Sequence, residues 1–232
     1  MKSESEEHKI TESVQDYLKT IYKLQESEGT VSTTQIANEL GFTGASVTGM
    51  LKRLAEIRDE NDNPLVDYNS YKGVRLTSFG TRVALNVLRN HRLLELFLKE
   101  SLGFSLAKVH TEADELEHYI SEDFVEKIDS ILGNPSYSPL GNPIPNKDGE
   151  VPKSSKLSLA VAELNRKYVV QRISDHNNEM IAYFEEKGFL PGLHLTPLSR
   201  APFNGPISIL YNGKEEIIGH EIAKNMFVDE IE

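Results

Sequence analysis

The chain contains neither cysteine nor tryptophan among its 232 residues. The absence of cysteine excludes disulfide bonds, thiolate zinc sites, iron–sulfur clusters and thiol nucleophiles, and it is compatible with a reducing cytosol. Any metal site must therefore be built from His, Asp and Glu. The first residues, MKSESEEHKITES, lack the apolar segment of a secretory signal, and no later stretch reaches membrane-spanning length. We expect a soluble, cytoplasmic protein with no membrane partner.

Basic residues are also in the minority. The chain has 25 Lys and Arg and 36 Asp and Glu, which gives a formal net charge of -11. A chain with this balance is not a general binder of nucleic acid. Its length suits one large or two small domains with a real hydrophobic core.

Two short helices dominate the pattern near the amino terminus. A first amphipathic helix is predicted from Ser13, its cap, to Gly29. Helices over 31–41 and 43–56 follow, with a glycine in the tight turn between them, which is typical of a helix-turn-helix. Short strands at 65–68 and 74–77 flank a polar turn and predict a hairpin. A helix-turn-helix followed by a hairpin is a winged helix.

The remainder of the chain changes character twice. Residues 77–132 are helical in period and rich in leucine, which favours a dimer interface. Turn formers at 134–145 and a polar stretch to 156 indicate a linker. The last segment predicts a helix over 178–187 and short strands at 193–198, 207–211 and 216–218, a small mostly β-barrel module.

Candidate metal ligands concentrate on the central helices. In the segment 110–118, His110, Asp114, Glu117 and His118 fall within an arc of roughly 100° on one side of a helix. His91 and Glu95 are one turn apart, so both side chains can reach one ion. Such all-nitrogen and oxygen sets suit Mn²⁺, Fe²⁺, Co²⁺ or Zn²⁺. The alternative is a Glu-rich solvated helix face that carries stray histidines.

Four short motifs after the winged helix carry a family resemblance: Asn90-His91-Arg92-Leu93, Val109-His110, Glu117-His118 and Gly141-Asn-Pro-Ile-Pro145. With them the chain resembles the diphtheria toxin repressor family of metal-dependent transcription regulators, in its manganese-responsive branch. The resemblance runs from about Ser13 to the carboxyl end. It implies a mainly α fold with a winged helix-turn-helix domain (1–76), a helical metal-binding and dimerisation domain (77–146), a linker (147–157) and an SH3-like, FeoA-type β-barrel domain (158–232).

The resemblance also implies two metal sites per subunit, for Mn²⁺ or Fe²⁺. The regulatory site would use Asp16, Asp114, Glu117 and His118, and the ancillary site His91, Glu95, His110 and Asp175. The iron-responsive branch has methionine and cysteine where this chain has Asp16 and Asp114, and hard oxygen ligands favour Mn²⁺. Lys19 replaces a glutamate of some manganese regulators, which argues against a two-metal form of the regulatory site.

For DNA, the resemblance implies a homodimer that binds a palindromic operator and represses metal-uptake genes. The second helix of the helix-turn-helix would enter the major groove, and the hairpin would hold the adjacent backbone. Gly49 stands where the family has a base-reading glutamine. The expected contacts are Thr43, Ala45, Ser46, Thr48, Gly49, Lys52, Arg53, Tyr71 and Lys72.

Two other functions compete with this interpretation. A metal-dependent hydrolase could use the same His and carboxylate cluster, although the sequence has no HExxH, no nucleophile elbow and no phosphate-binding glycine loop. In a metal-independent winged-helix interaction module, the histidines would occupy core or surface positions without binding a metal. We expect a regulator and not an enzyme.

Overall fold

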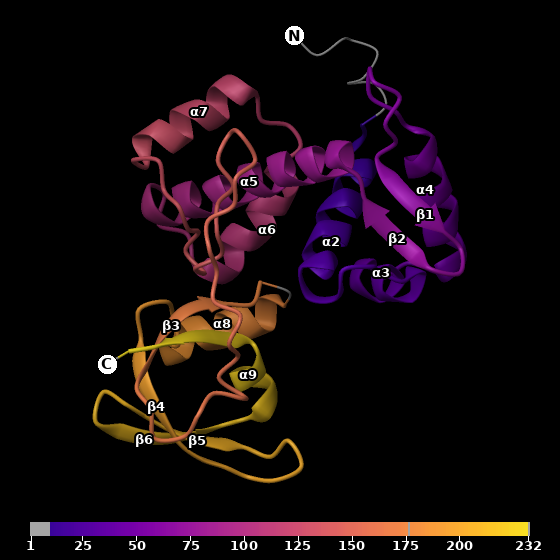
Figure 1. The fold of residues 1–232 in the computed structure, drawn as a ribbon. Coiled ribbons are helices and arrows are strands. Elements are labelled where there is room, and N and C mark those ends of the chain that lie inside the picture. Colours follow the sequence, from indigo (N-terminus) through magenta and orange to yellow (C-terminus); the bar gives the residue numbers. More distant parts are fainter. Residues whose placement is uncertain (1–9, 176, 232) are drawn as a thin grey trace. The chain divides into compact units, whose positions relative to one another are not determined.

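The computed structural model describes residues 10–175 and 177–231, and Figure 1 shows its helices and strands. The polar amino-terminal segment predicted to lack a signal lies in part outside these residues. The chain divides into two compact units after Asn90, and the short segment Lys147–Gly149 belongs to the first unit. Within the described ranges, no helix combines the length and the apolar character that crossing a membrane requires.

The first unit opens with three helices: α2 (Glu12–Glu28), α3 (Thr33–Leu40) and α4 (Gly44–Glu56). α2 begins before the predicted cap Ser13, since Thr11 is its N-cap residue. At α3, the Ser32 hydroxyl accepts from the Gln35 amide while the Gln35 side chain accepts from the Ser32 amide, a complete capping box. Gly41 ends α3 in the left-handed conformation, and the chain turns directly into α4. The predicted helix-turn-helix is present.

The hairpin follows α4 and consists of β1 (Val66–Asn69) and β2 (Gly73–Leu76), paired antiparallel. Gly73 has φ +93°, and a Cβ there would lie 2.4 Å from the Val31 carbonyl oxygen. Only glycine allows this approach, through which Val31 and Val74 exchange two backbone hydrogen bonds. One core joins helices and hairpin, and includes Val14, Leu18, Ile21, Ile36, Val47, Leu51, Leu54, Leu65 and Val74.

α5 (Ser78–Glu100) is a continuous helix whose second half begins the second unit. It is followed by α6 (Leu106–Leu116) and α7 (Glu122–Ile131). Leu93 and Leu94 of α5 pack with Ala113, Val125 and Ile128 in a small core. This core fixes α6 beside α5, so that the ligand-rich segments of the two helices face each other.

The turn-forming segment 134–145, predicted as the start of a linker, is buried in its last five residues. Residues Gly141–Pro145 are all buried, and the guanidinium of Arg92 donates to the Pro143 carbonyl. Ile173 donates its amide to the Leu140 carbonyl at 2.9 Å. Two of the sequence motifs, 51 residues apart at Arg92 and Pro143, are therefore packed together.

The C-terminal module is a five-stranded antiparallel sheet with two helices (Figure 1). Its elements are β3 (Tyr168–Ile173), α8 (Asn178–Lys187), β4 (His194–Arg200), β5 (Ile207–Tyr211), β6 (Lys214–Ile218), α9 (His220–Lys224) and β7 (Met226–Glu230).

The strand order β6-β5-β4-β3-β7 is open, so the predicted closed barrel is not what the described pairings form. After β6 the chain forms α9 and then β7, which pairs with β3 at the edge of the sheet opposite β6. The predicted helix over 178–187 and the three predicted strands are present. α9 and β7 were not predicted, because their apolar runs are only a few residues long.

Candidate metal centre and DNA-facing helix

His91 and Glu95 lie one turn apart on α5 and are almost completely buried, at 0% and 1% exposure. His110 comes from α6 and completes a group of three donors. The pairs are His91 Nε2 to Glu95 Oε1 at 3.1 Å, His91 Nε2 to His110 Nδ1 at 3.2 Å, and His110 Nδ1 to Glu95 Oε1 at 3.0 Å. Three of the four predicted ancillary ligands are thus brought together from two helices.

The size of this triangle fits a divalent ion. With metal–ligand bonds of about 2.1 Å, adjacent ligands of a six-coordinate ion are roughly 3 Å apart. Two imidazole nitrogens and one carboxylate oxygen are also a donor set that first-row divalent metals accept. The geometry and the chemistry of the three side chains therefore agree with a metal site.

Glu95 has two features that favour a cation. Burial raises the pKa of its carboxyl, but the charge of His91 and hydrogen bonds from His110 and His91 outweigh burial and bring the pKa to about 2. Its second oxygen, Oε2, is buried and has no hydrogen-bond partner among residues 10–175 and 177–231. An ionised buried carboxylate with an unused oxygen is costly unless a cation or donor satisfies it.

A second donor group surrounds the other ring nitrogen of His91. Its Nδ1 lies 2.6 Å from Glu117 Oε2 and 3.3 Å from Asp114 Oδ1. The other oxygen of Glu117 lies 3.4 Å from His118 Nε2. His91 therefore contacts predicted ligands of both sites, although the prediction assigned these ligands to two separate ions. Periodicity along one helix could not reveal this, since the contact depends on how α5 and α6 pack.

Two predicted ligands remain, Asp175 and Asp16. Asp175 is buried at 7% exposure in the turn after β3, and it belongs to neither donor group described above. Asp16 is half-buried on α2 in the first unit. Both assignments stay predictions.

α4 presents most of its predicted DNA contacts to solvent. Thr43, Ala45, Ser46, Gly49, Lys52 and Arg53 are exposed and Thr48 is half-buried. The Thr43 hydroxyl caps the helix by accepting from the Ser46 amide at 3.2 Å. The Thr48 hydroxyl donates to the Gly44 carbonyl at 2.8 Å, so its proton already has a partner inside the helix.

The turn of the hairpin exposes its two predicted contacts. The Asn69 side-chain oxygen accepts from the amides of Tyr71 and Lys72, at 2.9 and 3.2 Å, which shapes the turn. Tyr71 is 97% exposed, and Lys72 is exposed beside it. A turn shaped by these hydrogen bonds, with an exposed aromatic ring and an exposed cation, suits contact with a nucleic-acid backbone.

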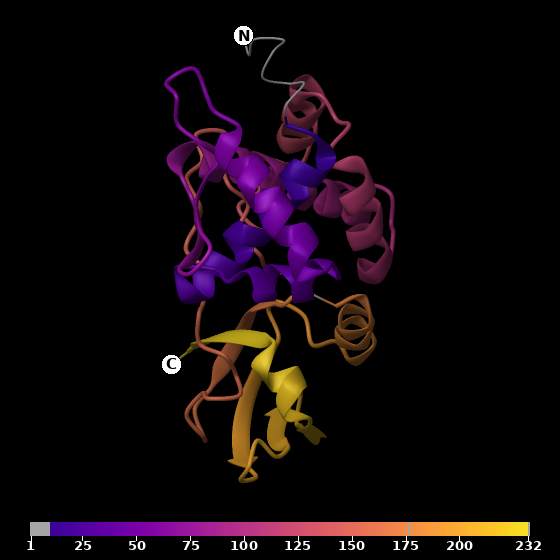
Figure 2. The same cartoon turned by 90° about the vertical axis from the view of Figure 1, so that its right-hand side faces the viewer.

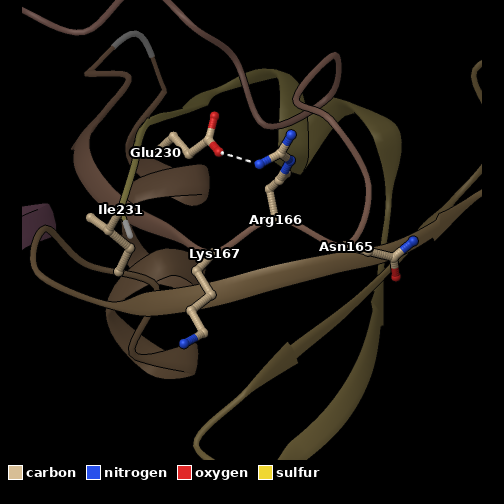
Figure 3. Close-up of a pocket in the computed structure, with 5 residues that line it drawn as sticks. All are labelled: Asn165, Arg166, Lys167, Glu230 and Ile231. Atoms are coloured by element: carbon tan, nitrogen blue, oxygen red, sulfur yellow. Dashed lines mark ion pairs between the residues drawn. The ribbon is translucent and has the colours of Figure 1, made fainter.

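A shallow pocket on the C-terminal module offers a different chemistry (Figure 3). It is lined by Asn165, Arg166, Lys167, Glu230 and Ile231, and Arg166 forms a 3.3 Å ion pair with Glu230 across it. Both partners of that pair are at least half exposed, and the lining includes no histidine. The pocket therefore does not compete with the buried donor groups as a metal site.

Comparison with protein families matches three successive segments of the chain. Residues 9–74 match the N-terminal DNA-binding domain of iron-dependent repressors, and residues 77–146 match their metal-binding and dimerisation domain. Residues 157–230 match the FeoA domain.

Individual relatives match over nearly the whole length. A solved manganese-dependent transcriptional repressor in complex with manganese is 36% identical, with a TM-score of 0.85, and the match covers 94% of this chain and 99% of that one. The iron-dependent repressor IdeR of Mycobacterium leprae is 28% identical over 96% of this chain and 99% of its own length. The diphtheria toxin repressor of Corynebacterium diphtheriae is also 28% identical, over the same shares.

Proposed function

Because this chain belongs to the diphtheria toxin repressor family of metal-dependent transcriptional repressors, we propose that Mn²⁺ is the ion that activates it for operator binding. It is a DNA-binding regulator and not an enzyme, and it dimerises as the family does. The hydrolase and the metal-independent module were wrong alternatives.

The observation that carries the proposal is the buried triangle of His91, Glu95 and His110. Three donor atoms lie 3.0 to 3.2 Å apart, and one buried oxygen of Glu95 has no partner in the part of the chain that the structure describes. Solvated histidines on a Glu-rich face would be exposed, whereas His91 and Glu95 are not. The divalent cation would supply a fixed positive charge at this point, and the three side chains would hold it.

We propose two metal sites in each subunit. The ancillary site comprises His91, Glu95 and His110, with Asp175 as the predicted fourth ligand. The regulatory site comprises Asp16, Asp114, Glu117 and His118. The absence of any thiolate and the number of carboxylates support Mn²⁺ over softer ions, and the solved relative named above is in complex with manganese.

For the DNA side we propose a palindromic operator read by α4 of each subunit, with Thr43, Ala45, Ser46, Thr48, Gly49, Lys52 and Arg53 on the groove and Tyr71 and Lys72 on the backbone. A two-fold dimer matches a two-fold DNA site. Exposed apolar side chains on α6, α7 and the turn between them support a dimer surface there: Leu116, Tyr119, Phe124 and Ile131. The proposed role is repression of metal-uptake genes by a cytoplasmic protein. The proposed domains comprise residues 1–76, 77–146 and 158–232.

Metal and DNA should stabilise each other, since each favours the same arrangement of the subunit. We expect a coupling of about 1–3 kcal/mol per subunit, the usual allosteric scale. The test is operator affinity by fluorescence anisotropy with and without Mn²⁺ at fixed ionic strength. Mg²⁺ at the same concentration is the matched control, because it prefers all-oxygen sites. Equal affinities in the apo and Mn²⁺ states would contradict the proposal.

A further inference from the structure

Glu185, near the end of α8, uses both carboxylate oxygens on other helices. Its Oε1 accepts from Lys99 Nζ at 2.9 Å, and its Oε2 accepts from the backbone amide of Leu106 at 3.0 Å. Lys99 lies in the last turn of α5, and Leu106 is the first residue of α6. One carboxylate of the C-terminal module therefore fastens the corner between the two helices.

This corner needs an outside partner because α6 does not cap itself. Ser105 is its N-cap residue, yet the Ser105 side chain makes no capping hydrogen bond. By contrast, α4, α7 and α8 are each capped by the side chain of their own N-cap residue. The first amides of a helix lack partners within it, and a carboxylate there is also favoured by the helix dipole. Glu185 supplies the missing cap.

Further contacts hold α8 against α6. The side-chain amide of Asn178 donates to the Thr111 hydroxyl at 3.2 Å, one residue after His110. Ile181 and Phe184 of α8 share a buried core with Leu106 and Val109 of α6. Figures 1 and 2 show α8 next to α6 in both views. α8 therefore contacts α6 on both sides of His110, at Leu106 and at Thr111.

The consequence concerns the donor triangle. His91 and Glu95 come from α5, and His110 comes from α6, so the distances between their donor atoms depend on the angle at the corner that Glu185 closes. Metal affinity is sensitive to groups that orient ligands without touching the ion, and their loss costs roughly 10- to 100-fold.

We propose that Glu185 is a positioning residue through which the C-terminal module sets the metal affinity of the His91–Glu95–His110 site. The proposal rests on the function proposed above. It assigns to the module a role that needs no ligand from it: α8 aligns α5 and α6 before any ion arrives.

The experiment compares full-length Glu185→Ala and Glu185→Gln with the wild type. Isothermal titration with Mn²⁺ should show about tenfold weaker binding at this site for Glu185→Ala. Glu185→Gln should lie between the two, since its amide oxygen can still accept from Leu106 but cannot pair with Lys99. The control is Glu186→Ala, an exposed carboxylate on the same helix, which should bind as the wild type does.

A second readout needs no metal. Hydrogen exchange of the apo protein should show the amides of the first turn of α6 exchanging about tenfold faster in Glu185→Ala, with α7 unchanged. If Glu185→Ala does not fold, Glu185→Gln decides by the same two measurements. Unchanged Mn²⁺ affinity or unchanged exchange in α6 overturns the positioning role. Failure of the wild type to bind Mn²⁺ would instead overturn the proposed function, while the exchange result still reports on the corner.

Discussion

The Nδ1 atom of His91 lies 2.6 Å from Oε2 of Glu117, although the two residues are 26 positions apart, and both side chains are fully buried. An ionised carboxylate accepts, so this contact favours the proton on Nδ1 and leaves Nε2 able to bind a cation. Nε2 faces Glu95 and His110. Because Glu117 also reaches His118, one imidazole and one carboxylate connect the two proposed sites.

The first prediction tests this connection in a chain whose regulatory site is already weakened by His118→Ala. Adding Glu117→Gln should weaken Mn²⁺ binding at the His91–Glu95–His110 site by about tenfold, because an amide can donate to Nδ1 as well as accept from it and so no longer fixes the tautomer of the ring. Isothermal titration measures the change. Glu115→Gln, an exposed neighbour on α6, is the control. Identical affinity with and without Glu117→Gln would show that the contact does not orient His91.

The second prediction concerns Asp114, whose side chain is 46% exposed while it contacts His91. Asp114→Ala should abolish Mn²⁺-stimulated DNA binding and leave fold and dimer intact, since a half-exposed carboxylate contributes little to the core. Anisotropy with operator DNA, circular dichroism and size-exclusion chromatography measure the three properties. Glu112→Ala, exposed on the same helix, should retain stimulation. Retained stimulation in Asp114→Ala would remove this residue from the regulatory site.

The third prediction follows from the lowered pKa of Glu95. Its ordinary value is 4.5 and the folded value about 2, so the ionised form stabilises the fold above pH 4.5. That stability is lost as the pH falls from 4.5 toward 2, and we expect a loss of about 3 kcal/mol over this window. Urea unfolding of the apo protein should show this loss in the wild type and a smaller one in Glu95→Gln. Parallel pH curves for the two proteins would mean that His91 and His110 do not hold the carboxylate ionised.

Local signals in the sequence were sufficient for the winged helix. The Ser32–Gln35 capping box, the left-handed Gly41 and the polar turn at Asn69 each act within a few residues, and the predicted helices and hairpin are present. α9 and β7 were not predicted because a five-residue element is too short to show a periodicity of its own, and β7 is held by its pairing with β3. The barrel was expected from short strands separated by glycine and proline and from the family resemblance. Closure of a barrel depends on which strand edges pair, and the described pairings form an open sheet in which β7 pairs with β3.

The candidate site also has one part that the sequence predicts and one part that it does not. The i, i+4 spacing identified His91 and Glu95, because one helix turn fixes their separation. The approach of Glu117 to His91 and of Glu185 to Leu106 joins different helices, and no spacing along one helix encodes it. In the sequence, nothing distinguishes Glu185 from other acidic residues on a polar helix face, because its partners Lys99 and Leu106 are distant along the chain.

The fourth prediction tests the proposed DNA contacts of α4 through the salt dependence of binding. Lys52 is exposed on α4 among the predicted contacts, and a lysine that neutralises one phosphate releases about one condensed counterion. Lys52→Ala should therefore weaken operator binding in the presence of Mn²⁺ and reduce the slope of log affinity against log salt by about 0.9 for each bound subunit. Lys127→Ala, an exposed lysine on α7, removes the same charge from the other unit and should leave the slope unchanged. If both variants lower the affinity equally and neither changes the slope, net charge governs binding and α4 does not contact the phosphates.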